Sequence, residues 1–511
     1  MSSSKTNSVP GPSPICGSTT AGAAASRPTS RFATSPPPSS APARSRCRSN
    51  TSRPATRATN SASAACGEVP PRPHRPAVPP TPVELLSRRA ALRRGLGAIL
   101  ACGVAPRILP AALFGAAAPS NRITIGLIGN GLICNSHIAS LAPRDDCRIV
   151  AVCDVWRRQA EAARGRIEKL YAADTAGGTW RGVDLYARHE ELLARPDLEA
   201  VFVTTPDHWH TPIARAAMLA GKDVYCEKPA TLTVREGRLL VETARRHGRV
   251  FQTGSQQRSN AAFRRAAEFV RNGFIGDLTR IRTRLGEFPA PPALPVQPIP
   301  PDLDYDRWLG PTPWRPYHAR RIAGDYAGGW RCFTEYGARK NGDWGAHHFD
   351  IIQWALDADA SGPVEFVPRG FDGAPYQSHR YASGVRVERF EDGLKSMIEF
   401  TGTKGTIWVS RGNEFATEPA SLAERRVRSD EIRLYASDSH HSDFFDCIRH
   451  RQRPICDVEI GHRTASICHL STIAGQLGRA IRWDPVREEI VSDPMAASLL
   501  DRPRRAPYVL A

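Results

Sequence analysis

The segment that most constrains the fold is 123–137, where an apolar run meets closely spaced glycines and then a helical pattern. The run ITIGLIG is continuously apolar, which is typical of a strand buried on both faces of a parallel sheet. Gly129 and Gly131 permit a tight turn and a close approach of the backbone to a pyrophosphate. Leu132 and Ile133 then open a helix whose first N–H groups would face the phosphates. The segment predicts a Rossmann-type, doubly wound α/β domain that binds a dinucleotide, with a nucleotide-free domain of that fold as the alternative.

The next apolar run, RIVAVCD (148–154), predicts a second buried strand that ends in an acid. Asp154 lies 25 residues after Gly129, where a carboxylate accepts hydrogen bonds from the adenosine ribose and repels a 2′-phosphate. This favours NAD as the cofactor, while Arg157 and Arg158 keep NADP open as an alternative.

Strand and helix patterns alternate as far as residue 256, which predicts an open parallel sheet with ligands at the carboxyl ends of its strands. The polar residues at those ends are the predicted cofactor contacts: Thr204, Thr205, Pro206, His210, Glu227 and Lys228, with His208 beside them. Lys228 is unusual, because the chain has seven lysines against 62 arginines. A lysine beside a nicotinamide can have a lowered pKa and act as an acid or a base.

Charge is unevenly distributed along the 511 residues, and this bears on the choice of partner. The net charge is +18, but residues 1–120 hold 15 basic and 2 acidic residues and so account for +13 of it. A basic leader on a nearly neutral body indicates targeting rather than nucleic-acid binding.

The first 120 residues divide into two segments of different composition. Residues 1–82 are rich in Ser, Pro, Ala and Arg, a composition that predicts disorder. A true start at Val83 is an alternative that would leave those residues outside the natural coding sequence. Residues 83–120 predict a twin-arginine signal peptide around Arg88 and Arg89, and hence a periplasmic or extracellular protein.

The apolar stretch 95–118 contains glycines, two prolines and Arg107, so no stable membrane span is predicted. Two alternatives to the twin-arginine signal peptide stay open: the arginine pair is fortuitous, or a lipid is attached at Cys102. The eight cysteines after residue 120 lack zinc-like spacing, and several of them, such as Cys153 and Cys226, fall in apolar strands. They predict buried free thiols rather than a disulfide framework.

Several strings together carry a family resemblance. IGNGLICNSH, AVCDV, VTTPDHWH, YCEKP and GDWGAHHFDIIQW resemble the Gfo/Idh/MocA family, which includes glucose–fructose oxidoreductase and inositol dehydrogenases. The similarity runs over about residues 121–485. TGSQQRSN, LDYDRWLGP and DWGAHHFD are similar to a secreted, twin-arginine branch of that family.

The resemblance implies a Rossmann domain over 121–256 and a second α/β domain over 257–485, followed by a tail over 486–511. The second domain is implied to hold a large, open, mainly antiparallel sheet. One face of that sheet would carry the substrate site and the other a homo-oligomer interface, in a dimer or tetramer.

The resemblance also assigns residues. Lys228 matches the catalytic lysine of the E-K-P motif, and Asp343 and His347 match the acid and the histidine of a second motif. Asp350 matches a further acid that orients its neighbours. The implied activity is hydride transfer between a nicotinamide cofactor and a hydroxyl of a sugar, cyclitol or glycoside.

The chemistry of alcohol oxidation supports these roles, because a base must take the hydroxyl proton as hydride leaves. His347 is the first choice for that base and Lys228 would polarise the same oxygen, although which of them takes the proton stays open. Asp343 lies four residues before His347, so on a helix its carboxylate would orient the imidazole. There are two alternatives to this catalytic role. His347 and His348 could be a core or capping histidine pair, or Asp343, His347 and Asp350 could bind a metal; we predict no metal.

Residues 286–343 are rich in proline and aromatic residues, which is typical of a functional loop. Its aromatic side chains either stack on sugar rings or pack the loop: Trp308, Trp314, Tyr317 and Trp330. Arg331 and Glu335 are candidate hydroxyl ligands. The predicted substrate contacts are Trp330, Arg331, His348 and Asp350.

We consider three functions for a chain with these features. The first is an exported NAD(P)-dependent oxidoreductase of a sugar or glycoside that holds its NAD tightly. The second is a glycoside hydrolase that uses bound NAD⁺ in a cycle of oxidation, elimination and reduction. The third, a noncatalytic sugar-binding protein, is disfavoured by the intact set of Lys228, Asp343 and His347.

Overall fold

The computed structural model describes residues 121–172, 180–286, 291–326, 328–391 and 393–510. The predicted disordered leader (1–82) and signal peptide (83–120) lie outside the described residues. Within those ranges, no helix combines the length and the apolarity that a membrane crossing requires.

The first sheet of the described chain has six parallel strands in the order β3-β2-β1-β4-β5-β6, the doubly wound arrangement that we predicted. The strands are β1 (Ile123–Ile128), β2 (Cys147–Cys153), β3 (Asp184–Tyr186), β4 (Ala200–Val203), β5 (Asp223–Cys226) and β6 (Phe251–Thr253). Ile128 is in register with Cys153 and Val203, and Val203 is in register with Cys226. The residues that follow these four strands therefore emerge along one edge of the sheet.

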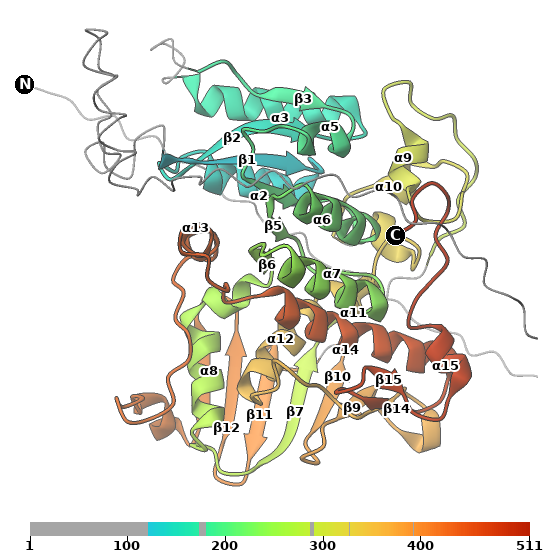
Figure 1. The fold of residues 1–511 in the computed structure, drawn as a ribbon. Coiled ribbons are helices and arrows are strands. Elements are labelled where there is room, and N and C mark those ends of the chain that lie inside the picture. Colours follow the sequence, from blue (N-terminus) through green and yellow to red (C-terminus); the bar gives the residue numbers. More distant parts are fainter. Residues whose placement is uncertain (1–120, 173–179, 287–290, 327, 392, 511) are drawn as a thin grey trace, which may run out of the picture. The chain divides into compact units, whose positions relative to one another are not determined.

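Helices pack on both faces of this sheet (Figure 1). They are α2 (Leu132–Leu141), α3 (Arg157–Leu170), α5 (His189–Leu193), α6 (His210–Leu219) and α7 (Val234–Arg246). One apolar cluster joins α2 and α3 to the strands, and a second joins α5, α6 and α7 to the opposite face. The eight described cysteines are all free and buried, as the sequence predicts.

A helix from the far end of the chain completes the first of these clusters. Helix α13 (His440–His450) buries Phe444 and Phe445 completely, among the residues of α2, α3 and the strands. The amphipathic pattern over 443–454 predicts this helix but not its place on the Rossmann domain.

The second sheet has nine described strands in the order β13-β12-β11-β7-β10-β9-β8-β14-β15. Its pairs are antiparallel except for β7 with β10, which confirms a large, mainly antiparallel sheet. The strands are β7 (Leu278–Arg284), β8 (Glu365–Val367), β9 (Ser378–Arg380), β10 (Arg386–Phe390), β11 (Ile398–Gly402), β12 (Thr406–Ser410), β13 (Glu414–Glu418), β14 (Ile481–Asp484) and β15 (Glu489–Ile490).

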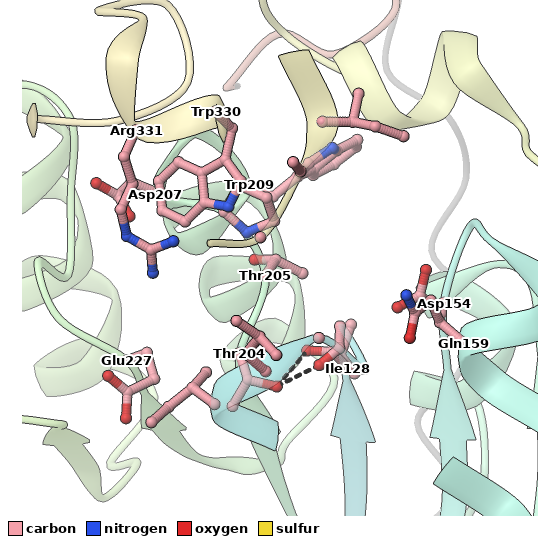
Figure 2. Close-up of a pocket in the computed structure, with 18 of the residues that line it drawn as sticks. Ile128, Asp154, Gln159, Thr204, Thr205, Asp207, Trp209, Glu227, Trp330 and Arg331 are labelled. Carbon is pink, nitrogen blue, oxygen red and sulfur yellow. Dashed lines mark hydrogen bonds between the residues drawn. The ribbon is translucent and has the colours of Figure 1, made fainter. Parts of the chain in front are cut away.

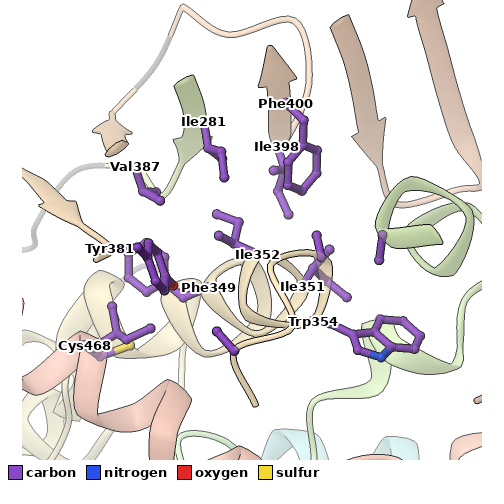
Figure 3. Packing of buried hydrophobic residues seen from close by; sticks show 14 of the residues in the cluster. Ile281, Phe349, Ile351, Ile352, Trp354, Tyr381, Val387, Ile398, Phe400 and Cys468 are labelled. Carbon is purple, nitrogen blue, oxygen red and sulfur yellow. The ribbon is translucent and has the colours of Figure 1, made fainter. Parts of the chain in front are cut away.

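Three helices supply the core of this domain: α8 (Ala261–Arg271), α12 (Gly345–Ala355) and α14 (Val458–Leu477). Figure 3 shows α12 beneath the strands, with Ile352 and Ile351 pointing toward Ile281 and Ile398. All residues of α12 are buried, because α8 and α14 contact it where the sheet does not. Burial on every side fixes the direction of each α12 side chain closely.

The proline-rich connection between β7 and α12 packs around its own aromatic residues. It contains the short helices α9 (Tyr305–Leu309), α10 (Ala319–Ile322) and α11 (Arg339–Asp343). Trp308, Tyr317 and Trp330 are buried in one cluster with Tyr305 and Tyr336. Trp314 is 58% exposed and lies outside the cluster. Loop packing therefore accounts for Tyr317, whereas Trp308 packs in the cluster and also lines the cavity described below.

The stretch 486–511, expected as a tail, holds β15 and helix α15 (Pro494–Ser498). Leu500 is buried, and its carbonyl accepts a hydrogen bond from Arg235 N at 3.1 Å. Arg504 forms an ion pair of 2.9 Å with Glu236 of α7. The described part of this stretch is therefore packed against the Rossmann domain rather than free.

Candidate active site

A cavity of about 930 Å³ lies at the carboxyl ends of β1, β2, β4 and β5 and is bounded by the proline-rich connection and the start of α12. Figure 2 shows Asp154 and Gln159 at one end, Glu227 and Arg331 at the other, and Thr204 between them. Ligands of doubly wound sheets bind at this edge.

The glycine turn after β1 lines the cavity. Gly129 has φ +88°, and a Cβ there would lie 2.6 Å from the backbone nitrogen of Thr205. A Cβ at Gly131 would meet nothing within 4 Å, so the backbone is open at the start of α2. Leu132 and Ile133 line the cavity beside it. No side chain caps α2, so its first N–H groups are available to an anion.

Asp154 lies at the tip of β2, where the sequence predicts the ribose contact. Its Oδ2 accepts a hydrogen bond from Asn130 N at 2.6 Å and its Oδ1 accepts one from Trp156 N at 2.8 Å. Burial raises the pKa of Asp154 to about 6. The carboxylate therefore braces the glycine turn as well as facing the cavity.

The two arginines that kept NADP open do not line the cavity. Arg157 pairs with Glu161 at 2.8 Å on the exposed side of α3. Arg158 stacks 3.6 Å above the Trp156 ring.

Thr204, Thr205 and Pro206 line the middle of the cavity, as predicted. Thr204 Oγ1 donates to the carbonyls of Ile128, at 3.3 Å, and Gly129. The loops that follow β1 and β4 are thus tied together.

His210 is a correction to the predicted cofactor contacts. It is buried and does not line the cavity; its ring nitrogens lie 2.9 Å from Thr205 O and 2.7 Å from Pro229 O. His208 is likewise buried, with Nε2 2.8 Å from Trp308 O. His210 therefore joins the loops that carry Thr205 and Lys228, and His208 joins its own loop to the proline-rich connection; neither lines the cavity.

Lys228 and Asp343 meet at the far end. Lys228 Nζ donates to Asp343 Oδ1 at 2.6 Å and to the Asp343 carbonyl at 3.1 Å. Burial alone would lower the pKa of Lys228, but the charges of Asp343 and Glu227 outweigh it and the pKa is raised. Burial opposes ionisation of Asp343 too, yet the charges of Lys228 and Arg331 hold its pKa below the ordinary value. Lys228 is therefore a cation here.

Glu227 also lines the cavity, and its carboxylate is in contact with a histidine. Its Oε1 lies 3.1 Å from His137 Nε2, and His137 Nδ1 lies 3.0 Å from His441 Nε2. The Glu227 carboxylate is thereby oriented from α2 and α13.

His347 faces the same end of the cavity and is 3% exposed. Its Nδ1 has no hydrogen-bond partner. Burial, with the charges of Lys228 and Arg411, holds the pKa of His347 well below its ordinary value. The imidazole is therefore neutral.

The predicted pairing of Asp343 with His347 is wrong. The helix is interrupted at Trp344, between α11 and α12, and Asp343 bonds Lys228 instead. An i,i+4 contact requires one continuous helix.

His348 and Asp350 are also corrections, since neither lines the cavity. His348 Nδ1 lies 3.2 Å from Thr283 Oγ1 under the sheet, and burial lowers the pKa of His348 to about 3. Asp350 Oδ2 accepts from Arg258 Nε at 2.9 Å, inside the domain core. Asp350 cannot join Asp343 and His347 around a metal with its carboxylate turned to Arg258.

Trp330 and Arg331 line the cavity as predicted, whereas Glu335 pairs with Arg315 outside it. The Arg331 guanidinium carbon lies 4.1 Å from the Trp330 ring centroid, and Arg331 Nε lies 3.7 Å from Asp343 Oδ1. An aromatic face beside cations and a carboxylate suits a polyhydroxylated ring.

Further residues line the cavity that the sequence analysis does not select, among them Asp207, Gln256, Trp344 and Arg411. Trp344 and Asp207 adjoin predicted residues and were within reach of the motif reasoning. Arg411 follows β12, where only the fold brings it to the cavity.

One acid–histidine group among the described residues has metal-like spacing: Glu459, His462 and Glu488. Arg238 bonds both carboxylates, at 2.8 and 2.6 Å. The group is a charge network between α7 and α14, away from the cavity.

The structure thus has two α/β sheets and a cavity that is lined by the glycine turn at one end and by a lysine, a carboxylate and a neutral histidine at the other. Two family profiles match the chain: "Oxidoreductase family, NAD-binding Rossmann fold" over residues 123–255 and "Oxidoreductase family, C-terminal alpha/beta domain" over residues 288–510. The chain belongs to the Gfo/Idh/MocA family of oxidoreductases.

Individual relatives match over part of their length. An inositol 2-dehydrogenase of Agrobacterium fabrum is 36% identical over 143 residues, which are 28% of this chain and 39% of the relative. A glycosyl hydrolase family 109 protein of Shewanella sp. is 32% identical over 160 residues, 30% of this chain and 33% of the relative. The chain thus spans between a third and about half of the curated relatives it matches. Among solved structures, an aldose–aldose oxidoreductase from Caulobacter crescentus covers 71% of this chain and 99% of its own, at 16% identity and a TM-score of 0.49.

Proposed function

We propose that this protein is an NAD-dependent dehydrogenase that oxidises a secondary hydroxyl of a sugar or cyclitol. The observation that carries the proposal is the meeting of Lys228, Asp343 and His347 at the end of the cavity that begins at the glycine turn. The inositol 2-dehydrogenase relative supports the substrate class.

The lining residues fit a dinucleotide along its length. The open backbone at Gly131 and the uncapped start of α2 suit the pyrophosphate, and Asp154 suits the ribose hydroxyls. A carboxylate at this position, with Arg157 and Arg158 turned elsewhere, favours NAD over NADP.

The charges of the site give each residue a role. NAD⁺, when bound, supplies the hydride acceptor. His347, which is neutral and lines the cavity, takes the proton of the reacting hydroxyl. Lys228 stays protonated and donates a hydrogen bond to the same oxygen, which stabilises charge that develops there. Asp343 keeps Lys228 charged and in position.

The test is the absorbance spectrum of protein purified without added cofactor, recorded before and after each of a panel of sugars, cyclitols and glycosides. We expect the NADH band to appear with one class of compound and to be absent in Lys228→Met. Absence of dinucleotide, both in the purified protein and on titration, would overturn the proposal.

A second candidate is a hydrolase that oxidises, eliminates and then reduces with the same bound NAD. The family 109 relative favours it. Stoichiometry separates the two: a dehydrogenase accumulates NADH with product, whereas the hydrolase releases the aglycone with no lasting NADH.

Three further properties belong to this proposal: export by the twin-arginine route, tight retention of NAD and homo-oligomerisation. The arginine pair at 88–89 supports export. Cell fractionation of an Arg88→Lys/Arg89→Lys variant, mass analysis of the denatured supernatant and light scattering test them in turn.

A further inference from the structure

Arg411 differs from the other cations at the catalytic end of the cavity. Lys228 bonds Asp343 at 2.6 Å, and Arg331 lies 3.7 Å from the same carboxylate. Lys340 Nζ donates to the Tyr326 carbonyl at 3.1 Å. Arg411 donates from Nε to Gln257 Oε1 at 3.2 Å, and its two terminal nitrogens have no acceptor among the described residues.

The carboxylates of the cavity are already engaged elsewhere. Asp343 holds Lys228, Glu227 lies against His137, and Asp154 accepts from two backbone amides at the opposite end. Asp207 Oδ2 accepts from Ala338 N at 3.1 Å. Asp325 is exposed to solvent, where its charge is screened.

The Arg411 side chain is held in position by two neighbouring side chains. Its guanidinium carbon lies 4.8 Å from the Trp344 ring centroid, and Gln257 is buried beneath it. Burial lowers the pKa of Arg411, against the opposing charge of Asp343. An arginine that stacks on an aromatic ring, is partly desolvated and keeps both terminal nitrogens unpaired is pre-organised to bind a planar oxyanion such as a carboxylate.

We infer that Arg411 binds a carboxylate of the substrate, so that the preferred sugar is a hexuronate rather than a neutral sugar. This inference rests on the proposed function. His347 and Arg411 both line the cavity, and the Trp344 ring lies 6.4 Å from the His347 ring and 4.8 Å from the Arg411 guanidinium carbon, so we assign the carboxylate and the reacting hydroxyl to one sugar unit.

The probe pair is D-glucuronate and D-glucuronamide, which have nearly the same shape and differ in charge. Binding is measured by quenching of tryptophan fluorescence, with and without NAD⁺, because Trp344 and Trp330 line the cavity. We expect glucuronate to bind about tenfold or more tighter than the amide, as a charge-assisted bidentate contact provides.

Arg411→Gln removes the charge and should bring the two affinities within about threefold of each other, while Arg411→Lys should give an intermediate ratio. Arg482→Gln is the matched control, because Arg482 is an exposed arginine on β14 away from the cavity. Thermal unfolding and NAD⁺ titration of each variant verify the fold.

Equal binding of acid and amide by the wild type, binding of neither, or a preference that survives Arg411→Gln would each overturn the inference. Oxidation of neutral sugars with no preference for uronates would leave the proposed dehydrogenase intact. Failure to bind NAD⁺ would count against the dehydrogenase instead, and the uronate measurement without NAD⁺ would still decide on Arg411.

Discussion

Lys228 Nζ lies 2.6 Å from Asp343 Oδ1, although the two residues are 115 positions apart in the chain. The contact joins the loop after β5 of the Rossmann sheet to the end of α11. It commits the Asp343 carboxylate to the lysine and leaves His347 without an acidic partner. The charged lysine and the neutral histidine are two consequences of one arrangement.

Replacing Asp343 by Asn should shift the alkaline limb of the pH–rate profile to lower pH. Burial lowers the pKa of Lys228 and the charge of Asp343 raises it, so removal of that charge lets burial dominate. Activity that requires protonated Lys228 is lost as pH rises through the Lys228 pKa, and that loss then begins earlier. The measurement is kcat against pH, with Asp446→Asn on the surface of α13 as control; an unshifted limb would show that Asp343 does not set the charge of Lys228.

Replacing His347 by Gln should lower kcat about 10²- to 10⁴-fold, the usual contribution of a general base. Because the pKa of His347 is held low, wild-type activity should persist below the ordinary imidazole range and fall only as pH drops through the lowered value. His348→Gln is the matched control, since His348 is the buried neighbour that lies outside the cavity. A comparable loss of kcat in both variants would contradict the assignment.

The two glycines of the turn should respond differently to alanine. Gly129→Ala should lower the free energy of unfolding by about 1–3 kcal/mol, because φ is +88° and the new Cβ meets Thr205 N. Gly131→Ala should leave stability unchanged but weaken NAD binding, since its Cβ enters open space at the phosphate end. Urea unfolding and NAD titration separate the effects; equal loss of stability in both would refute this description of the turn.

Arg258 and Asp350 should matter for stability rather than for substrate affinity. Their side chains are 1% and 0% exposed, and Arg258 also pairs with Asp359 at 2.7 Å. Arg258→Met leaves a carboxylate buried without its partner and should cost about 3–5 kcal/mol in unfolding free energy. Asp350→Asn should leave KM unchanged; a raised KM in the folded variant would restore Asp350 as a substrate contact.

The Rossmann half was predictable because its signals are local. Strands buried on both faces are continuously apolar; Gly129 and Asp154 each follow one of them directly, and Lys228 is the second residue after another. The second sheet as a whole came only from the resemblance, since β7 pairs with the distant strands β10 and β11 and β8 pairs with β14.

The site was predictable where side chains follow strand ends and not where they lie on α12. Every position of α12 is buried, so polarity does not reveal which of His347, His348 and Asp350 faces the cavity. The break at Trp344 changes the partner of Asp343, and the flanking Gly342 and Gly345 are the residues that could have signalled a helix end. Arg411 and Arg258 are two among 62 arginines, and only the fold distinguishes them.

Helix α13 has a practical consequence for anyone who wishes to recombine the two domains. Phe444 and Phe445 come from the C-terminal half of the chain but fill the apolar core of the nucleotide-binding half. A fragment that stops near residue 256 would expose that core to water, whereas a chimera with another substrate domain would need to import a helix matched to α2 and α3. The boundary along the chain is therefore not a boundary of autonomous folding.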